Sequence, residues 1–212
     1  MSARERILGR LRAAQQPFTD VQPRETRHMM TPVMAHTSDD LRVAFLESAR
    51  KLNIRTLHTT DPEAALDYVL DIIGADTHIL AWDVNAIPLR GLDEALTGKN
   101  ITVAPPRSDN VRVGITGVEF ALAATGSIVV SATKGHNRAV SLLPTVHIAI
   151  MTSQQILPHF EAYIDRAKTD LDTWRKTENH AIITGASRTA DIAMELVNGA
   201  HGPAELHIVI VE

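Results

Sequence analysis

Residues 61–83, DPEAALDYVLDIIGADTHILAWD, contain one complete helix-to-strand unit and indicate the fold class of the chain. Asp61 is a typical N-cap residue, Pro62 suits the first helical position, and the helix is expected to end near Gly74. The apolar run HILAWD at residues 78–83 then predicts a strand. A helix followed directly by a strand is the repeating unit of α/β proteins.

The same alternation continues through most of the sequence. Further helices are predicted over residues 37–53 (with Ser38 as N-cap), 89–98, 117–124 and 153–171, the last bent near Pro158. Further strands are predicted over residues 54–59, 100–106, 126–132, 145–151, 180–185 and 206–212. This order predicts an α/β fold with a mainly parallel sheet and helices on both faces. In such sheets, ligands bind beyond the carboxyl ends of the strands.

The length of 212 residues and the hydrophobic content of 44% fit one globular domain with an additional segment. We predict an N-terminal helix and extended arm over residues 1–36, and a single α/β domain over residues 37–212. The start, MSARERILGRLRAAQQ, is typical of a short docking helix. Pro17, Pro23 and Pro32 interrupt any periodicity in the residues that follow it.

The charge and residue content exclude several classes of protein. A net charge of −4 gives no electrostatic footprint for nucleic acid. The absence of cysteine excludes disulfides, thiolate catalysis and an iron–sulfur cluster held by this chain alone. No apolar run approaches the roughly 20 residues that span a bilayer, so no membrane span is expected. These features predict a cytoplasmic protein.

The ten histidines show no metal-binding pattern. None lies in an HExxH pair, so no metal site is predicted. His78, His147 and His207 lie near the starts of predicted strands and are interpreted as structural. His136 and His201 lie in loops flanked by glycine and are better functional candidates.

Most candidate site residues lie between Gly114 and Pro144. Glu119 is a carboxylate among apolar neighbours, expected on the predicted helix at 117–124, on its solvated face or partly buried. The turn of Thr125, Gly126 and Ser127 could hold an anion through N–H and hydroxyl groups, or serve geometry alone. The following loop offers a cationic cradle for an anion through Lys134, Asn137, Arg138 and Ser141.

A second candidate region is GASRTAD at residues 185–191. A strand is expected before it and a helix after it, capped by Ser187. Arg188 would then oppose the helix dipole, unless Asp191 pairs with it or an anion binds there together with Thr189. We therefore expect Arg138 and Arg188 to converge on a small anionic ligand.

Three motifs resemble the lactate utilization protein C family, whose domain is called the LUD domain: GITGVEFALAATGSIVV, NRAVSLLPTVHIAI, and ITGASRTADIAMELVNGAHGPAELHIVIVE. The likeness implies that residues 37–212 are a single LUD-like domain with a fold like that of ribose-5-phosphate isomerase, glucosamine-phosphate deaminase and the CoA transferases. It also implies membership of a bacterial L-lactate oxidation system, in which companion subunits carry iron–sulfur clusters. By motif match, the shared pocket would contain Glu119, Thr125, Gly126, Ser127, Arg138, Ser141, Ser187, Arg188, Thr189 and Asp191.

The leading interpretation is a subunit of an L-lactate oxidation complex with an anion-binding pocket, in which Glu119 acts as general base or orients an arginine. It implies iron–sulfur subunits as partners, no cofactor in this chain, and a homo-oligomer as one possible state. A second interpretation is a stand-alone enzyme of the isomerase or cyclo-ligase type, acting on a phosphorylated or ATP-activated small molecule. A third is a non-catalytic assembly protein that docks through the arm at residues 15–36.

Overall fold

The computed structural model describes residues 2–14, 37–106, 108, 110–133, 135–169, 171, 174, 177, 179–190, 196–199 and 201–212. The chain divides into two compact units, residues 1–31 and residues 32–212. In the first unit, helix α1 (Ala3–Ala14) exposes the side chains of Ile7 and Leu11, one turn apart. The predicted arm at residues 15–36 lies outside the described residues. In the described part of the chain, no helix has the length and apolar content needed to cross a membrane.

The second unit is built on a six-stranded sheet in which all strands are parallel, in the order β1-β12-β7-β4-β2-β3. Its strands are β1 (Arg55–Thr59), β12 (Glu205–Val211), β7 (Val146–Thr152), β4 (Val113–Gly117), β2 (His78–Ala81) and β3 (Thr102–Val103). The central strands are buried, with Ile115, Ile148 and Ile208 fully covered. The predicted parallel α/β fold is confirmed. We call the side where these strands end the carboxyl edge, and the opposite side the amino edge.

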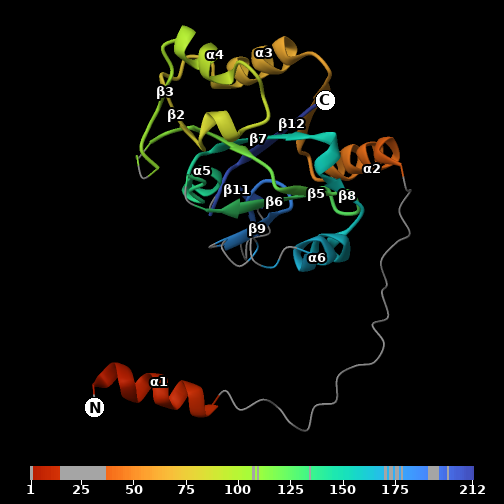
Figure 1. The fold of residues 1–212 in the computed structure, drawn as a ribbon. Coiled ribbons are helices and arrows are strands. Elements are labelled where there is room, and N and C mark those ends of the chain that lie inside the picture. Colours follow the sequence, from red (N-terminus) through yellow and green to blue (C-terminus); the bar gives the residue numbers. More distant parts are fainter. Residues whose placement is uncertain are drawn as a thin grey trace. The chain divides into compact units, whose positions relative to one another are not determined.

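Helices cover the main sheet on both faces. α3 (Pro62–Ile73) and α4 (Leu92–Gly98) lie on one face, and α2 (Ser38–Lys51) and the short α5 (Ala139–Leu142) lie on the other (Figure 1). Asp61 caps α3 by accepting a hydrogen bond from Glu63 N–H, and Gly74 ends the helix, as the sequence predicts. Thr37, one residue before the predicted Ser38, caps α2.

A second, four-stranded sheet lies beyond α2 and α5, in the order β8-β5-β6-β9 (Figure 1). Its strands are β8 (Ile156–Leu157), β5 (Phe120–Leu122), β6 (Ser127–Ala132) and β9 (Asn179–Ile183). The helix predicted at residues 117–124 is wrong, because this segment is strand β5. A turn at Gly126, whose φ of +66° suits glycine, folds β5 back onto β6 and places Phe120 opposite Val129.

The helix predicted over residues 153–171 is only partly correct. The chain first makes a 3₁₀ turn, η2 (Ser153–Gln155), then strand β8, and becomes α6 (Phe160–Thr169) after Pro158. Proline is disfavoured inside a helix, and β8 instead pairs with β5 through Ala121 and Leu122. Tyr163 of α6 packs with Leu122 and so joins the helix to the second sheet.

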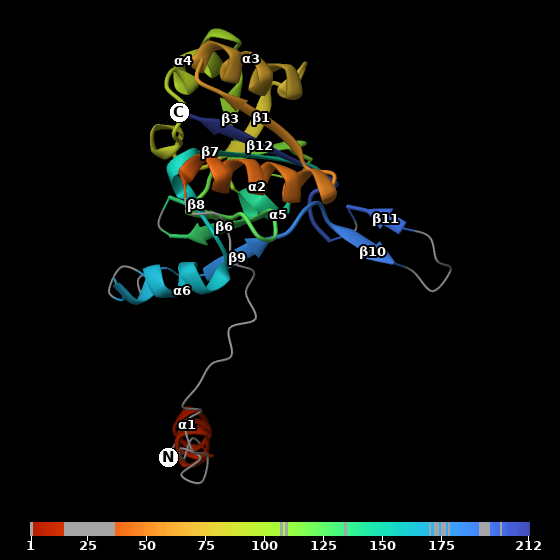
Figure 2. The ribbon, with the colours of Figure 1, turned by 90° about the vertical axis from the view of Figure 1, so that its right-hand side faces the viewer.

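The helix predicted after Ser187 is also wrong. β10 (Arg188–Ala190) and β11 (Leu196–Asn198) form an antiparallel hairpin in which Arg188 lies opposite Asn198. A helix over these residues would separate its ends by about 15 Å. Gly199, with φ of +78°, instead returns the chain, and its N–H donates a 2.9 Å hydrogen bond to Ser187 O. Figure 2 shows the hairpin on the side of the molecule opposite the end of β12.

Candidate functional site

A cavity of about 520 Å³ lies at the carboxyl edge of the main sheet. It begins where β2, β4 and β7 end, at Trp82, Gly117 and Thr152. The second sheet supplies Ser131, and the segment between β4 and β5 supplies Glu119. The remaining lining residues are Ala86, Pro88, Val118, Thr133, His136, Gln155 and Thr177. The cavity therefore lies where ligands of parallel α/β sheets bind.

Glu119 forms part of the cavity wall, and neighbouring backbone and side-chain groups fix its position. It lies between β4 and β5, and its N–H donates a 2.9 Å hydrogen bond to Val129 O. The side-chain amide of Gln155 donates to the carbonyl oxygens of Val118 and Glu119, and Gln155 Oε1 accepts from Thr152 N–H at 2.7 Å. Gln155 thus ties the end of β7 to the segment that carries Glu119.

The carboxylate of Glu119 belongs to a hydrogen-bonded cluster with Ser131 and His180. Ser131 Oγ donates to Glu119 Oε2 and lies 2.9 Å from His180 Nδ1, which is 3.6 Å from Glu119 Oε2. Ser131 and His180 lie opposite each other in the β6–β9 ladder. Ser131 is 8% exposed, whereas the Glu119 side chain is 33% exposed and lines the cavity. The cluster can therefore exchange hydrogen bonds with a molecule in the cavity.

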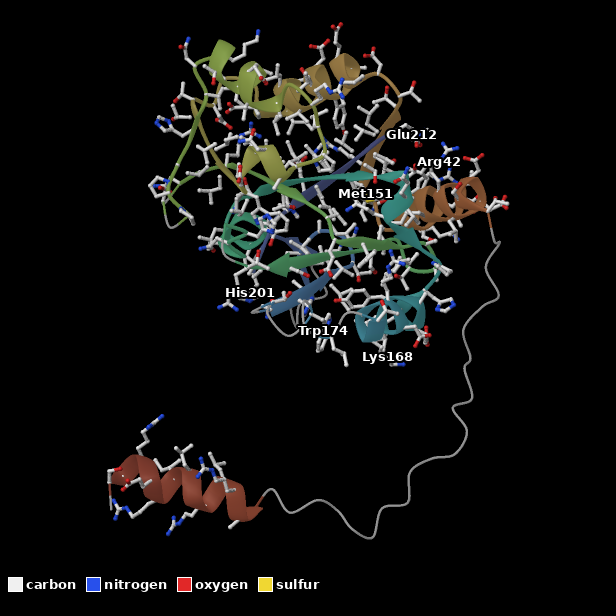
Figure 3. The ribbon with its side chains drawn as sticks, in the orientation of Figure 1. Arg42, Met151, Lys168, Trp174, His201 and Glu212 are labelled. Atoms are coloured by element: carbon white, nitrogen blue, oxygen red, sulfur yellow. The ribbon has the colours of Figure 1, made fainter. Side chains whose placement is uncertain are left out.

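Two aromatic residues complete the cluster behind His180. Tyr163 OH lies 3.0 Å from His180 Nδ1, and Trp174 Nε1 donates to Tyr163 OH at 3.4 Å. The indole of Trp174 stacks on the His180 ring with centroids 4.9 Å apart; Figure 3 labels Trp174 near α6. Burial raises the pKa of the Tyr163 phenol, and the nearby charge of Glu119 adds to this shift, while the hydrogen bond from Trp174 opposes it. Tyr163 therefore remains protonated at neutral pH.

Trp82 and His136 also line the cavity. Their rings stack with centroids 4.2 Å apart and an interplanar angle of 13°. Trp82 Nε1 donates a 3.2 Å hydrogen bond to Asn137 O, which holds residues 135–137 against the end of β2. Arg138 follows directly, at the N-terminus of α5. Of the two loop histidines favoured from the sequence, His136 lines the cavity.

The predicted anion turn at Thr125, Gly126 and Ser127 has a visible structural role. Thr125 Oγ1 lies 2.7 Å from Ser127 Oγ, which lies 2.8 Å from Thr184 Oγ1. Gly126 presses against α2, since a Cβ placed on it would meet Ala49 N at 2.7 Å. The hydroxyl groups of this turn are therefore already paired, and the turn does not line the cavity.

The structure does not bring Arg138 and Arg188 together, so their predicted convergence is wrong. Arg188 Nη2 donates a 2.8 Å hydrogen bond to Leu52 O, three residues before β1 begins. Ser187 N–H donates to Pro203 O, two residues before β12 begins. Both lie at the amino edge, because the parallel strands start there. Arg188 lies in β10, which pairs with β11, whereas Asn137, the residue before Arg138, contacts Trp82 at the carboxyl edge.

The remaining predicted site residues fall into two groups. Ser141 is buried, and its Oγ donates a 3.1 Å hydrogen bond to Arg138 O within α5. Lys134, Asp191 and the side chain of Thr189 lie outside the described residues. Sequence reasoning missed the cavity residues Trp82, Ser131, Thr152 and Gln155, and also His180 behind them. Only the rule that ligands bind beyond strand ends could have indicated Trp82 and Thr152.

A second polar cluster at the carboxyl edge lies outside the cavity. Glu212 Oε1 lies 2.8 Å from His58 Nε2, its Oε2 accepts from Ser153 Oγ at 2.5 Å, and Arg42 Nη1 lies 2.9 Å from His58 Nδ1. Figure 3 shows Glu212 and Arg42 near one another. The hydrogen bond from Ser153 is the main cause that lowers the pKa of Glu212, followed by the hydrogen bond from His58. The polar side chains of this cluster are therefore paired with one another by hydrogen bonds.

His147 and His207, near the starts of β7 and β12, make hydrogen-bond contacts within the fold. His147 is buried, its Nε2 lies 2.9 Å from Thr116 Oγ1, and burial lowers its pKa to about 4. His207 Nδ1 lies 2.9 Å from Tyr68 OH, and burial lowers its pKa as well. Among the described residues, no three His, Asp or Glu side chains gather as a metal site.

Comparison with known proteins gives consistent matches. The LUD domain family model matches residues 43–211. A "Lactate utilization protein C" of Macrococcus caseolyticus is 28% identical over 201 residues, covering 93% of this chain and 79% of the relative, and one of Shouchella clausii is 27% identical over 210 residues, covering 90% and 91%. The crystal structure of a DUF162 family protein from Deinococcus radiodurans superposes with a TM-score of 0.60 at 15% identity, covering 84% of this chain and all of that one. This structural likeness supports the fold.

Proposed function

Since this chain belongs to the LUD domain family, we propose that it works in L-lactate utilization and that its carboxyl-edge cavity binds a small organic acid. The relatives named lactate utilization protein C align over most of the chain, which supports the pathway. The observation that carries the binding site is the cavity itself, because it combines a strand-end position with convergent polar groups.

The lining suggests how an organic acid would be oriented. Glu119 repels a carboxylate, so the hydroxyl of a 2-hydroxy acid would donate to Glu119, and the C–H beside the carbonyl of a 2-oxo acid would face it. The ligand's carboxylate would then lie near His136 and the hydroxyl of Thr133. In this proposal the anion is held by one loop at the carboxyl edge, without Arg188.

The chemistry of lactate oxidation supports a partner subunit. Conversion of lactate to pyruvate releases two electrons, which must pass to an electron acceptor. With no cysteine, this chain lacks the usual ligands of an iron–sulfur cluster. We therefore propose that iron–sulfur subunits assemble with it. Co-purification of a tagged chain with proteins that show iron–sulfur visible absorption would support this partner, and purification of the chain without any such protein would contradict it.

Calorimetric titration with L-lactate, pyruvate and phosphate tests the binding site. Ala86 lines the cavity from an exposed position on the 3₁₀ turn η1 (Val84–Ala86), so Ala86→Trp should block the cavity without disturbing the core. Its neighbour Asn85 is exposed and does not line the cavity, which makes Asn85→Trp the matched control. We expect binding to fall about tenfold or more in Ala86→Trp only. Equal affinity in both variants would contradict the proposal.

Growth of the host tests the pathway. Deletion of the gene should abolish growth on L-lactate while growth on pyruvate continues. The Asn85→Trp variant should restore growth on L-lactate, and the Ala86→Trp variant should not. Normal growth of the deletion strain on L-lactate would refute a role in this pathway.

Catalysis by the isolated chain is a second candidate. The cluster of Glu119, Ser131 and His180 favours it, because a carboxylate and an imidazole linked by a hydroxyl are suited to acid–base work. Turnover by the purified chain without a partner would support this candidate.

A further inference from the structure

The contacts around His180 favour one tautomer of its ring. His180 Nε2 lies 3.4 Å from the carbonyl oxygen of Trp174, which can only accept, so a hydrogen bond between them requires a hydrogen on Nε2. Tyr163 OH receives the Trp174 indole N–H and lies 3.0 Å from His180 Nδ1. Because an unprotonated Nδ1 has one lone pair, it accepts a hydrogen from either Tyr163 or Ser131, and not from both at once. The remaining question is which hydrogen lies between His180 Nδ1 and Ser131 Oγ.

Ser131 has one hydroxyl hydrogen and two close partners. Its Oγ lies against Glu119 Oε2 on one side and 2.9 Å from His180 Nδ1 on the other. If Glu119 is ionised and His180 is neutral, Ser131 can donate its hydrogen to only one of these two partners. In the other contact, a lone pair of Ser131 Oγ faces a lone pair of the partner atom. One added proton satisfies both contacts. It can lie on Glu119, with Ser131 donating to Nδ1, or on Nδ1, with Ser131 donating to Glu119.

These two arrangements differ by a concerted shift of two protons. We propose that Glu119, Ser131 and His180 form a proton relay that opens on the cavity and serves a bound 2-oxo acid with a C–H beside its carbonyl. The ligand class rests on the function proposed above. The relay itself rests on the shared hydroxyl of Ser131 and on the position of Glu119 in the cavity wall.

The reaction is a reversible enolisation. The Glu119 carboxylate takes the proton from the carbon next to the carbonyl, the C–H bond breaks, and its electron pair forms the enolate. Glu119 then passes a proton to Ser131 Oγ as Ser131 passes its own to His180 Nδ1. The reverse sequence returns a proton to carbon, so nothing is oxidised or reduced. Glu119 is the group that touches the ligand, while Ser131 and His180 are positioning residues that act through it.

Deuterium exchange into pyruvate tests the relay. Purified full-length chain is incubated with pyruvate in D₂O, and loss of the methyl proton signal is followed by NMR. We expect the wild-type chain to exchange these protons faster than buffer, and Glu119→Gln to reduce the rate to that of buffer. Ser131→Ala and His180→Gln should each lower the rate about tenfold or more. Ser131→Thr keeps the hydroxyl and should retain most of the rate.

Ser153→Ala is the matched control, because Ser153 makes the same serine–glutamate hydrogen bond to Glu212 outside the cavity. It should exchange pyruvate at the wild-type rate, and thermal unfolding of each variant confirms that it is folded. A wild-type rate equal to that of buffer would overturn the relay; if pyruvate still binds, the cavity proposal stands, and if it does not, both fail. Full exchange by Ser131→Ala, with Glu119→Gln inactive, would also overturn the relay.

Discussion

The guanidinium of Arg188 donates a 2.8 Å hydrogen bond to the carbonyl oxygen of Leu52, at the C-terminal end of α2. This contact places Arg188 at the amino edge of the main sheet, whereas the cavity is bordered by the strand ends at Trp82, Gly117 and Thr152. Arg188 therefore joins the hairpin to α2, and an exposed arginine in this place needs no ligand.

Arg188→Ala should weaken the fold slightly and leave ligand binding unchanged. One charge-assisted hydrogen bond at an exposed site is lost, so we expect the free energy of unfolding to fall by about 1 kcal/mol. Urea unfolding measures this loss, and calorimetry with L-lactate and pyruvate measures binding. A tenfold loss of ligand affinity in this variant would show that Arg188 belongs to the ligand-binding site.

Gly126→Ala should be strongly destabilising, although Gly126 does not contact the cavity. Its φ is +66°, and an added Cβ would meet the α2 backbone at 2.7 Å. We therefore expect the free energy of unfolding to fall by at least about 2 kcal/mol. Gly135 has φ of +92° and open space around it, so Gly135→Ala should cost about 1 kcal/mol from backbone strain alone. Thermal unfolding compares the two variants. Equal losses would show that close packing on α2 is unimportant.

His147 should make the fold sensitive to mild acid. Because burial lowers its pKa from 6.5 to about 4, the unfolded chain binds a proton below about pH 6.5 that the folded chain does not bind. The stability contributed by neutral His147 is present above pH 6.5 and is lost as the pH falls toward 4. When the pH is lowered from about 8 to about 5, the free energy of unfolding of the wild type should fall by about 2 kcal/mol more than that of His147→Gln. Urea unfolding at both pH values tests this, and parallel losses would contradict it.

Gln155→Leu should affect both stability and binding. It removes the hydrogen bonds to Val118 O, Glu119 O and Thr152 N–H, so we expect a loss of about 2 kcal/mol in the free energy of unfolding. Glu119 should also lose its fixed position, and binding of L-lactate should weaken. Gln155→Glu provides the comparison, because it restores the acceptor for Thr152 but not the donor. Wild-type binding in Gln155→Leu would show that Gln155 does not position Glu119.

Most strands of the main sheet could be predicted because their signals are local, but the central strand β4 (Val113–Gly117) was not among the predicted strands. The Asp61 cap, Pro62 and Gly74 bound α3 within a short stretch, and the apolar runs of β7 and β12 are continuous. The errors occurred where distant pairing determines the structure. Phe120–Leu122 becomes a strand because β6 and β8 pair with it, and Arg188–Ala190 because β11 does.

The candidate site was harder to predict than the fold. Glu119 and His136 could be selected as polar residues in unusual surroundings, and both line the cavity. Ser131 and His180 are 49 residues apart and meet only through the β6–β9 ladder, so no motif joins them. The two arginines carried the anion hypothesis because a helix was expected after Ser187, and the hairpin removes that geometry.

The most direct test of the carboxyl-edge site is an NMR map of backbone amide shifts during titration with L-lactate and with pyruvate. If the cavity binds these acids, the shifts should concentrate at the cavity segments, residues 82–88, 117–119, 131–136 and 152–155. The same titration of Ala86→Trp should leave those amides unmoved. Shifts that centre on residues 185–188, or an unchanged spectrum with both acids, would contradict the assignment.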